Sequence, residues 1–249
     1  MTKPIALITG ATSGIGLATA RLLSSDYRII ACGRREDRLK QLAGELSDSG
    51  IYTLRFDVRD RQAVQAALSN LPEDWKEIAV LVNNAGNAHG LDPIQDGNPD
   101  DWDAMIDINV KGLLYVSKAV IPGMTERQAG HIINIGSIAG KEVYPNGNVY
   151  CASKHAVDAI NNGMRIDLNP HGIRVTSVNP GLVETEFSDV RFKGDSDRAS
   201  KVYEGYQALK PEDVADVIRY VVTRPAHVML SDIVLLPTAQ ASSTILKKS

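Results

Sequence analysis

Short apolar runs bounded by turn residues recur along the chain, with amphipathic stretches between them. The runs have the length and the β-branched content of strands, and they are near-continuously apolar, as expected for strands covered on both faces. The predicted strands are 5–9, 28–32, 51–56, 78–82, 131–135, 174–178 and 233–236. The predicted helices between them are 14–24, 35–46, 60–69, 99–127, 149–169 and 211–223.

Two of the predicted helices begin at clear start signals. Asn98 precedes Pro99, and Pro211 stands in the first turn of the last helix, ahead of Glu212 and Asp213. Strand–helix alternation indicates βαβ units. We therefore expect an α/β chain with one doubly wound (Rossmann) fold over residues 1–249, in which helices flank a seven-stranded parallel sheet. Segment 184–209 is long, polar and non-periodic, which is typical of a lid over a binding site.

Composition narrows the functional classes. The 249 residues are 43% hydrophobic and 23% charged with a net charge of −3, which favours neither nucleic acid nor an anionic membrane as a partner. The two cysteines, Cys32 and Cys151, lie in apolar segments and are expected to be buried, reduced thiols. The five histidines have no metal-ligand spacing, and no leader or membrane span is evident, so we expect a cytoplasmic protein without a metal.

The first predicted strand runs into a glycine-rich turn, and a predicted helix follows at once. Glycines let the backbone turn sharply and approach a pyrophosphate, and the helix N-terminus supplies unpaired N–H groups. A plain strand–helix turn can also carry glycines, but the position in the first βαβ unit favours a dinucleotide site. The expected cofactor-binding residues of this turn are Gly10, Thr12, Ser13, Gly14, Ile15 and Gly16.

The end of the second predicted strand indicates which dinucleotide is bound. An NAD site would carry an acidic residue here, whereas the chain has Arg34 and Arg35. A guanidinium suits the 2′-phosphate of NADP, and a carboxylate would repel it. Glu36 and Asp37 are expected in the first turn of the next helix. We therefore predict NADP, the alternative being that the two arginines are a solvated helix entrance.

Tyr150 and Lys154 have the spacing of a proton-transfer pair. A free tyrosine, with a pKa of about 10, is a poor base at neutral pH. A lysine one helical turn away lies on the same helix face and would favour the phenolate. Ser137, at the end of the preceding predicted strand, would donate to the substrate oxygen. Tyr144 is the weaker candidate, because Asn148 stands four residues after it.

The ordered set of motifs resembles the short-chain dehydrogenase/reductase family over essentially the whole chain. The turn has the spacing Gly-x-x-x-Gly-x-Gly, and the later family marks are Asp57-Val58, Asn83-Asn84-Ala85-Gly86, Asn109, Ser137, Tyr150-x-x-x-Lys154 and Pro180-Gly181. The resemblance implies Tyr150 as general acid/base and Lys154 on the nicotinamide ribose. It also implies that Asn109 holds a water in a proton relay behind Lys154.

The resemblance also implies the rest of the cofactor site. Asp57 and Val58 would flank the adenine, and Asn84, with Ala85 and Gly86 beside it, would approach the ribose and nicotinamide. After the sixth predicted strand, backbone and hydroxyl groups would hold the nicotinamide amide and the diphosphate. The residues expected there are Pro180, Gly181, Val183 and Thr185.

Segments 134–140, 180–183 and 186–195 are similar to the branch of NADP-dependent 3-hydroxy acid dehydrogenases, which oxidise serine, L-allo-threonine and 3-hydroxy acids. This resemblance implies a small substrate that carries a carboxylate. Arg191 or Lys193 would clamp that carboxylate, unless both are solvated lid charges. Residues 141–144 depart from the branch at positions that would line the substrate pocket.

Two other functions stay open. One is a broad NADPH-dependent ketone, aldehyde or 3-oxoacyl reductase, and the other is an NADP-binding regulator without catalysis. The regulator is disfavoured because Asn109, Ser137, Tyr150 and Lys154 are all present. By resemblance, helices 99–127 and 149–169 would pair across a two-fold axis and give a homotetramer; alternatively, their apolar residues only cover the sheet.

Overall fold

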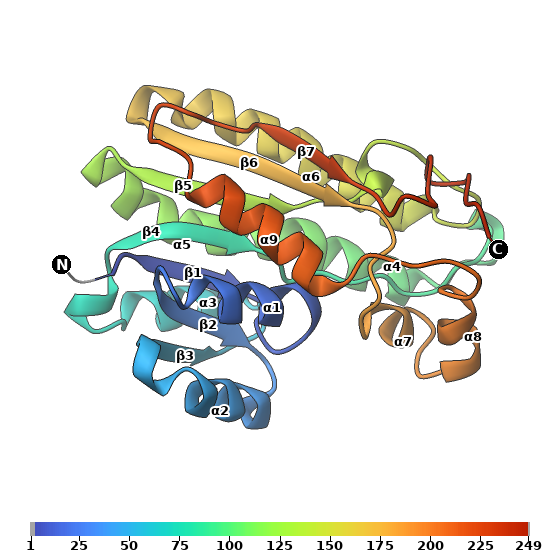
Figure 1. Ribbon diagram of the computed structural model, residues 1–249, viewed down its shortest axis with the longest axis horizontal. Helices are drawn as coiled ribbons and strands as arrows, with labels where there is room; N and C mark the ends of the chain where they lie inside the picture. The colour runs from blue at the N-terminus through green and yellow to red at the C-terminus, as the bar shows by residue number, and fades with distance from the viewer. Residues whose placement is uncertain (1–2, 249) are drawn as a thin grey trace.

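The computed structural model describes residues 3–248, and its centre is a parallel sheet of seven strands in the order β3-β2-β1-β4-β5-β6-β7. All neighbouring strands pair in parallel, and Figure 1 shows the arrows running toward the same side of the molecule. The strands are β1 Ile5–Thr9, β2 Arg28–Gly33, β3 Ile51–Arg55, β4 Ile78–Asn83, β5 Gly130–Ile135, β6 Ile173–Pro180 and β7 Asp232–Leu235. The predicted doubly wound α/β fold is confirmed.

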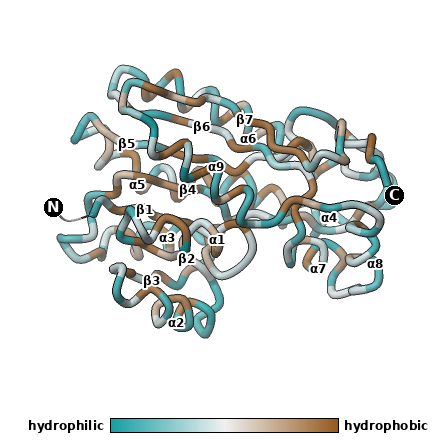
Figure 2. Tube along the Cα trace, in the orientation of Figure 1, coloured by the Kyte–Doolittle hydropathy of each residue, from teal (hydrophilic) through white to brown (hydrophobic). Residues whose placement is uncertain are grey.

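Helices cover both faces of the sheet, so the chain has three layers (Figure 1). The helices are α1 Gly14–Leu23, α2 Glu36–Glu45, α3 Arg61–Ser69, α4 Pro99–Ile106, α5 Leu113–Arg127, α6 Asn148–Leu168, α7 Phe187–Arg191, α8 Ser196–Lys201 and α9 Pro211–Val222. One apolar core joins the sheet to α1, α2 and α9, and a second joins it to α3, α5 and α6. Figure 2 shows the apolar positions concentrated along the strands and the inward helix faces.

Local chemistry explains where several helices begin. The Asp60 carboxylate accepts hydrogen bonds from two backbone N–H groups at the start of α3, and Asn98 caps α4 in the same way ahead of Pro99. Glu36 and Asp37 lie in the first turn of α2, as predicted. Cys32 and Cys151 are buried and unpaired, which confirms that expectation. Among the described residues, the structure has no helix long and apolar enough to cross a membrane.

The structure corrects three expectations about the elements. The strands are not all covered on both faces, because the edge strands β3 and β7 are partly exposed. The single helix predicted over 99–127 is instead α4, a π-helical turn Asp107–Gly112, and α5. The segment 184–209 is not one irregular loop, since it contains the short helices α7 and α8, which are below the length that periodicity detects. Asp195 caps α8 by accepting from Arg198 N.

A buried histidine in the sheet makes the fold sensitive to acid. The His131 side chain is 1% exposed, and its Nε2 lies 2.9 Å from the Thr176 hydroxyl, while Nδ1 has no partner among the described residues. Burial, with a smaller contribution from the positive charge of Arg174, lowers the pKa of His131 to about 3. The folded chain therefore holds this imidazole neutral over a pH range in which an unfolded chain would protonate it.

We expect the free energy of unfolding to fall by about 1.4 kcal/mol per pH unit, from this residue, as the pH drops below about 6.5. The sign follows because the unfolded state binds the extra proton there and the folded state does not until about pH 3. Urea unfolding of the wild type and His131→Gln at pH 7 and pH 5, at equal protein concentration, measures the difference. Equal pH dependence of the two proteins would contradict it.

Candidate functional site

A cavity of about 470 Å³ opens at the carboxyl ends of the strands. It lies where the strand order reverses, between β1 and β4, the place at which doubly wound sheets bind ligands. Nearly every predicted site residue lines it, from the glycine-rich turn and Arg34 to Ser137, Tyr150 and Arg191. Of the predicted site residues, Gly16, Asn109 and Lys193 are not on the cavity wall.

The glycine-rich turn requires glycine for conformation and for space. Gly10 and Gly14 have φ angles of +66° and +49°, which residues other than glycine rarely adopt. A Cβ on Gly16 would lie 2.4 Å from both the Gly10 carbonyl oxygen and Asn84 Nδ2. Gly16 therefore serves the close packing of the turn, from behind the cavity wall.

Asn84 lines the cavity and its side chain also binds the backbone of the glycine-rich turn. Its Nδ2 donates to the carbonyl oxygens of Thr9 and Gly10, at 2.9 and 3.3 Å. The backbone N–H groups of Asn84 and Ala85 both donate to the Thr9 hydroxyl at 3.0 Å. The Asn84 side chain thus fixes the end of β4 to the start of the glycine-rich turn, and Asn84 also lines the cavity.

Arg35 connects the glycine-rich turn to the lid, by which we mean segment 184–209. Its Nη2 donates to the hydroxyls of Ser13 and Thr12, at 2.7 and 3.2 Å. Its Nη1 forms an ion pair of 2.9 Å with Glu186, and Arg38 pairs with the other oxygen of the same carboxylate at 2.6 Å. Arg38 and Glu186 were not predicted as site residues, because one helical arginine and one acidic residue of a polar segment carry no pattern.

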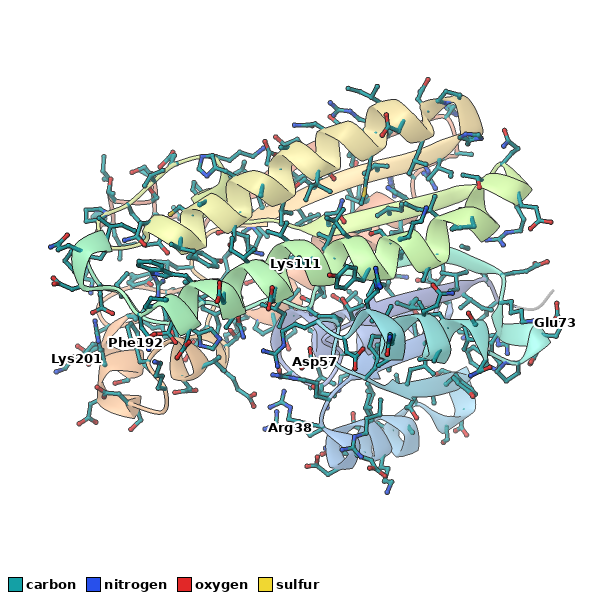
Figure 3. The ribbon with its side chains drawn as sticks, turned by 180° about the vertical axis from the view of Figure 1, so that it is seen from behind. Arg38, Asp57, Glu73, Lys111, Phe192 and Lys201 are labelled. Atoms are coloured by element: carbon teal, nitrogen blue, oxygen red, sulfur yellow. The ribbon has the colours of Figure 1, made fainter. Side chains whose placement is uncertain are left out.

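Asp57 forms a second charged cluster at the cavity, with Arg59 and Arg34. The Asp57 carboxylate is held by Arg59, with contacts of 2.7 and 3.1 Å, and lies 3.5 Å from Arg34 Nη1. Partial burial alone would raise the pKa of Asp57, but the hydrogen bonds from Arg59 outweigh it and the pKa is lowered. Four arginines thus face two carboxylates around the Arg34–Arg35 corner, which leaves an excess of positive charge for an anion. Figure 3 shows Asp57 and Arg38 on this side of the molecule, away from the lid residues Phe192 and Lys201.

Tyr150, Lys154 and Ser137 meet at the inner end of the cavity, as predicted. Tyr150 and Lys154 lie in the first two turns of α6, and each is 8% exposed. Lys154 Nζ donates to the Ile135 carbonyl oxygen at 3.0 Å. The Ser137 hydroxyl accepts from Ala139 N at 3.1 Å and caps the short helical turn after β5.

The acid–base properties differ from those expected. Burial raises the pKa of Tyr150, the Tyr144 hydroxyl adds to the rise, and a Ser137 hydrogen bond and the Arg191 charge oppose it. Burial lowers the pKa of Lys154 to about 8. The pKa of Tyr150 is therefore raised and not lowered, because desolvation dominates at both residues. The effect of Lys154 on Tyr150 stays a prediction.

Asn109 lies in the π-helical turn, which the helical periodicity could not predict. Its amide exchanges two hydrogen bonds with the backbone of Asn87, at 2.8 and 2.9 Å, and donates a third to Ser153 Oγ at 3.0 Å. Its side-chain oxygen would lie 2.8 Å from a Cβ on Gly86, and Lys154 Nζ would lie 3.7 Å from the same atom. Asn109 is therefore close behind Lys154, while its side chain holds the segment after β4.

The lid contacts the catalytic end of the cavity through α7. Arg191 Nη2 donates to the Tyr144 hydroxyl at 3.0 Å, and its Nε donates to the Gly90 carbonyl oxygen at 3.1 Å. Its guanidinium carbon lies 5.6 Å from the centre of the Tyr150 ring, and Phe187 packs against that ring edge-on. Lys193 instead pairs with Asp101 at 2.9 Å, outside the cavity wall.

The C-terminal segment supplies cavity residues that sequence reasoning missed. Gln240 and Ser243 lie on the cavity wall, and Gln240 Oε1 accepts from Leu182 N at 3.0 Å. Glu142 Oε2 accepts from Ser243 N at 2.7 Å, which joins the segment before α6 to the C-terminal segment. Figure 1 shows the red segment that follows β7 on the side of the sheet to which the strand arrows point. Nothing in the local sequence marked this tail, because its position is set by the fold.

Comparisons with known proteins agree with this geometry. The family model described as short chain dehydrogenase matches residues 4–195. The chain is 47% identical over 239 residues to the NADP-dependent 3-hydroxy acid dehydrogenase YdfG of Escherichia coli K12, covering 95% of this chain and 96% of the relative. It is 46% identical to sulfoacetaldehyde reductase 2 of Chromohalobacter salexigens over 242 residues, 96% of each chain. A structure described as the closed form of serine dehydrogenase complexed with NADP+ overlaps with a TM-score of 0.94, at 45% identity over 98% of this chain and 99% of the other.

Proposed function

The chain belongs to the short-chain dehydrogenase family, and from that premise we propose that it is an NADP-dependent oxidoreductase acting on a small 3-hydroxy acid or β-hydroxy amino acid. The observation that carries the proposal is the shared cavity: Tyr150, Lys154 and Ser137 open onto the space that the glycine-rich turn and Arg34 also line. One domain with a lid at 184–209 provides both the cofactor site and the substrate site.

The residues of the cavity fit NADP. Gly10 and Gly14 adopt the left-handed backbone that lets a turn approach a pyrophosphate. The excess of arginine over carboxylate at the Arg34–Arg35 corner suits a 2′-phosphate dianion. When bound, the nicotinamide supplies the hydride acceptor or donor. Asp57 and Val58 line the cavity, and we assign them to the adenine. The riboses, diphosphate and nicotinamide are assigned to further lining residues: Asn84, Ala85, Gly86, Pro180, Gly181, Val183 and Thr185.

The residues of this chain supply the proton chemistry. In carbonyl reduction the buried, neutral Tyr150 phenol donates a proton to the substrate oxygen, and in alcohol oxidation the phenolate takes the proton back. Ser137 donates a hydrogen bond to the same oxygen where negative charge develops. With a pKa of about 8, Lys154 can give up and take a proton near neutral pH. The relay behind it would run through a water held by Asn109, whose side-chain oxygen and Lys154 Nζ both lie near Gly86.

A carboxylate on the substrate has a partner in Arg191. Two of its five N–H donors bind Tyr144 and Gly90, so others remain for a substrate oxygen beside Tyr150. The sulfoacetaldehyde reductase relative favours a second candidate, the reduction of a small aldehyde that carries an acid group. In both candidates one carbon separates the acid group from the reacting carbon, so the same arginine serves either reaction.

The proposed function is tested by following NADPH absorbance with L-serine, L-allo-threonine and 3-hydroxypropionate, in parallel with NAD+. We expect turnover with NADP+ and little with NAD+. Turnover with NADPH and acid-bearing aldehydes alone would favour the second candidate. Oxidation of NADPH by neutral ketones only, with every acid inert, would contradict acid recognition.

Replacing Arg191 with glutamine is expected to raise KM for the acid substrates about 10- to 100-fold, because a hydrogen bond to a charged group contributes about 1.5–3 kcal/mol. Lys193→Gln is the matched control, since it removes a lid cation that pairs with Asp101 instead. Steady-state kinetics with one acid substrate and saturating NADP+ measure both variants. An equal rise in KM for the two variants would assign the effect to the lid as a whole.

We also propose that the protein is cytoplasmic and assembles as a homotetramer through α5 and α6. The two buried, unpaired cysteines support a reducing compartment. Exposed apolar side chains on the outer surfaces of these helices support an assembly, with Leu114 on α5 40% exposed and Ile166 on α6 70% exposed. Light scattering of the purified protein measures the number of subunits.

A further inference from the structure

Glu186 connects two parts of the molecule that are far apart in the sequence. It directly follows Thr185 at the beginning of the lid, and its carboxylate binds Arg35 Nη1 through Oε2 and Arg38 Nη1 through Oε1. Arg35 directly precedes α2, and Arg38 lies in the first turn of that helix. The two contacts therefore join the lid to the wall that carries the glycine-rich turn.

Arg35 and Arg38 also bind the glycine-rich turn directly. Arg35 donates to the hydroxyls of Thr12 and Ser13, and Arg38 Nη1 also donates to the Thr12 carbonyl oxygen at 3.3 Å. One carboxylate thereby holds two guanidinium groups against the backbone expected to face the phosphates. Loss of the carboxylate would leave the lid with no ionic contact, among those of the described residues, to this side of the cavity.

The Glu186 carboxylate is charged at neutral pH. Partial burial alone would raise its pKa, but hydrogen bonds from Arg35 and Arg38 outweigh this effect and lower the pKa below the ordinary value. The three side chains are about 40% exposed, so salt in the solvent weakens their attraction. Ion pairs of this strength can hold the lid closed and still separate often enough for the cofactor to leave.

The opposite end of the lid is held separately. Arg191 and the Gly90 backbone exchange two hydrogen bonds, and Lys193 pairs with Asp101 on α4. The lid thus crosses the cavity with one set of contacts at the catalytic end and one at the Arg35 end. Glu186 makes the ionic contacts at the Arg35 end.

We propose that Glu186 is a positioning residue for the cofactor, acting as a clasp with Arg35 and Arg38 that holds the lid across the dinucleotide cleft and slows the release of NADP(H). This inference rests on the proposed function, because it takes the cavity to be the NADP site. Release requires the lid to move, and the lid moves only after both ion pairs separate. Proton and hydride transfer take place with the clasp closed, so they do not depend on its strength.

The test is the dissociation rate of NADPH in the absence of substrate, measured by stopped-flow fluorescence as excess NADP+ displaces it. Glu186→Gln is expected to raise this rate about five- to tenfold, since it weakens two half-exposed ion pairs at once. The wild-type rate should rise with ionic strength, and the variant rate should change little. The rate of hydride transfer in a single turnover should stay within about twofold of the wild type.

Glu184→Gln is the matched control, because it removes the same charge two residues earlier, at an exposed side chain for which the structure records no ion pair in residues 3–248. Arg38→Gln provides an independent variant, since it removes one of the two ion pairs and keeps the Glu186 carboxylate and its pair with Arg35. It should also speed release, and the double variant Arg38→Gln/Glu186→Gln should release NADPH only slightly faster than Glu186→Gln.

Two outcomes would overturn the clasp. Equal release rates for Glu186→Gln and Glu184→Gln would show that the ion pairs do not control the lid. Slower release or tighter binding of NADPH by Glu186→Gln would mean that the carboxylate competes with the cofactor phosphates for the arginines. Either result leaves the turnover test of the proposed function intact, whereas failure of the wild type to bind NADPH would overturn both proposals.

Discussion

Replacement of Tyr150 with phenylalanine is expected to lower kcat by about 10³-fold, within the range by which a positioned general acid or base accelerates a reaction. The variant keeps the ring that packs against Phe187 and loses only the hydroxyl. The remaining Ser137 hydroxyl can still donate a hydrogen bond to the substrate oxygen, but it is too weak an acid to transfer its proton near neutral pH. KM and the dissociation constant of NADPH should therefore change much less than kcat.

The pH dependence of the reaction separates this role from a packing role. Because burial raises the pKa of Tyr150, the phenolate that alcohol oxidation needs becomes more populated as the pH rises. The wild-type oxidation rate should thus increase with pH, and the small residual rate of Tyr150→Phe should lose that increase. Tyr144→Phe is the control, since Tyr144 is a partly buried tyrosine on the same cavity wall and its hydroxyl accepts a hydrogen bond from Arg191. A tenfold or smaller loss for Tyr150→Phe, or an equal loss for Tyr144→Phe, would contradict the assignment.

The arrangement of the sheet and the position of the catalytic pair could be predicted from the sequence. Seven apolar runs alternated with helical stretches, and parallel strands bring their carboxyl ends to one edge, so groups that follow different strands had to meet there. Ser137 after β5 and Tyr150 at the start of α6 met in this way. The positions of these residues depend on the topology of the sheet, and the pattern of apolar residues predicts that topology.

The contacts of individual side chains could not be predicted in the same way. Asn84 and Asn109 are satisfied by backbone groups of segments distant in sequence, and the π-helical turn that carries Asn109 leaves no trace in a periodicity of 3.6 residues. The ion pairs of Glu186 with Arg35 and Arg38 could not be predicted, because only the fold brings α2 close to this polar segment. The raised pKa of Tyr150 depends on burial, which an i, i+4 spacing does not reveal.

For the lid too, the sequence predicted the segment but not the contacts of its side chains. The long, polar and non-periodic sequence of 184–209 predicted a lid, and the structure gives this segment two short helices with contacts at both ends. Arg191 and Lys193 were equivalent candidates for the substrate carboxylate when only the sequence was considered. The position of Arg191 on the cavity wall beside Tyr150 now favours it, because Lys193 is outside the cavity wall and pairs with Asp101.

The double variant Arg34→Gln/Arg35→Gln is expected to lower kcat/KM for NADP+ by about 10²- to 10⁴-fold and to change kcat/KM for NAD+ by less than about fivefold. Each arginine would lose a charge-assisted hydrogen bond to the 2′-phosphate, at about 1.5–3 kcal/mol, while NAD+ carries no such group. Arg35 also takes part in the clasp, so a small loss common to both cofactors should accompany the selective one.

Steady-state kinetics with each cofactor and one fixed acid substrate measure the change in preference. The matched control is Lys40→Gln/Arg55→Gln, which removes the same two positive charges from side chains that pair with Glu36, away from the cavity wall. If the control lost as much NADP+ preference as the Arg34/Arg35 variant, the selection would come from the overall charge of this corner. A selective loss in the Arg34/Arg35 variant alone requires direct contact with the phosphate, because long-range attraction acts on both pairs of side chains alike.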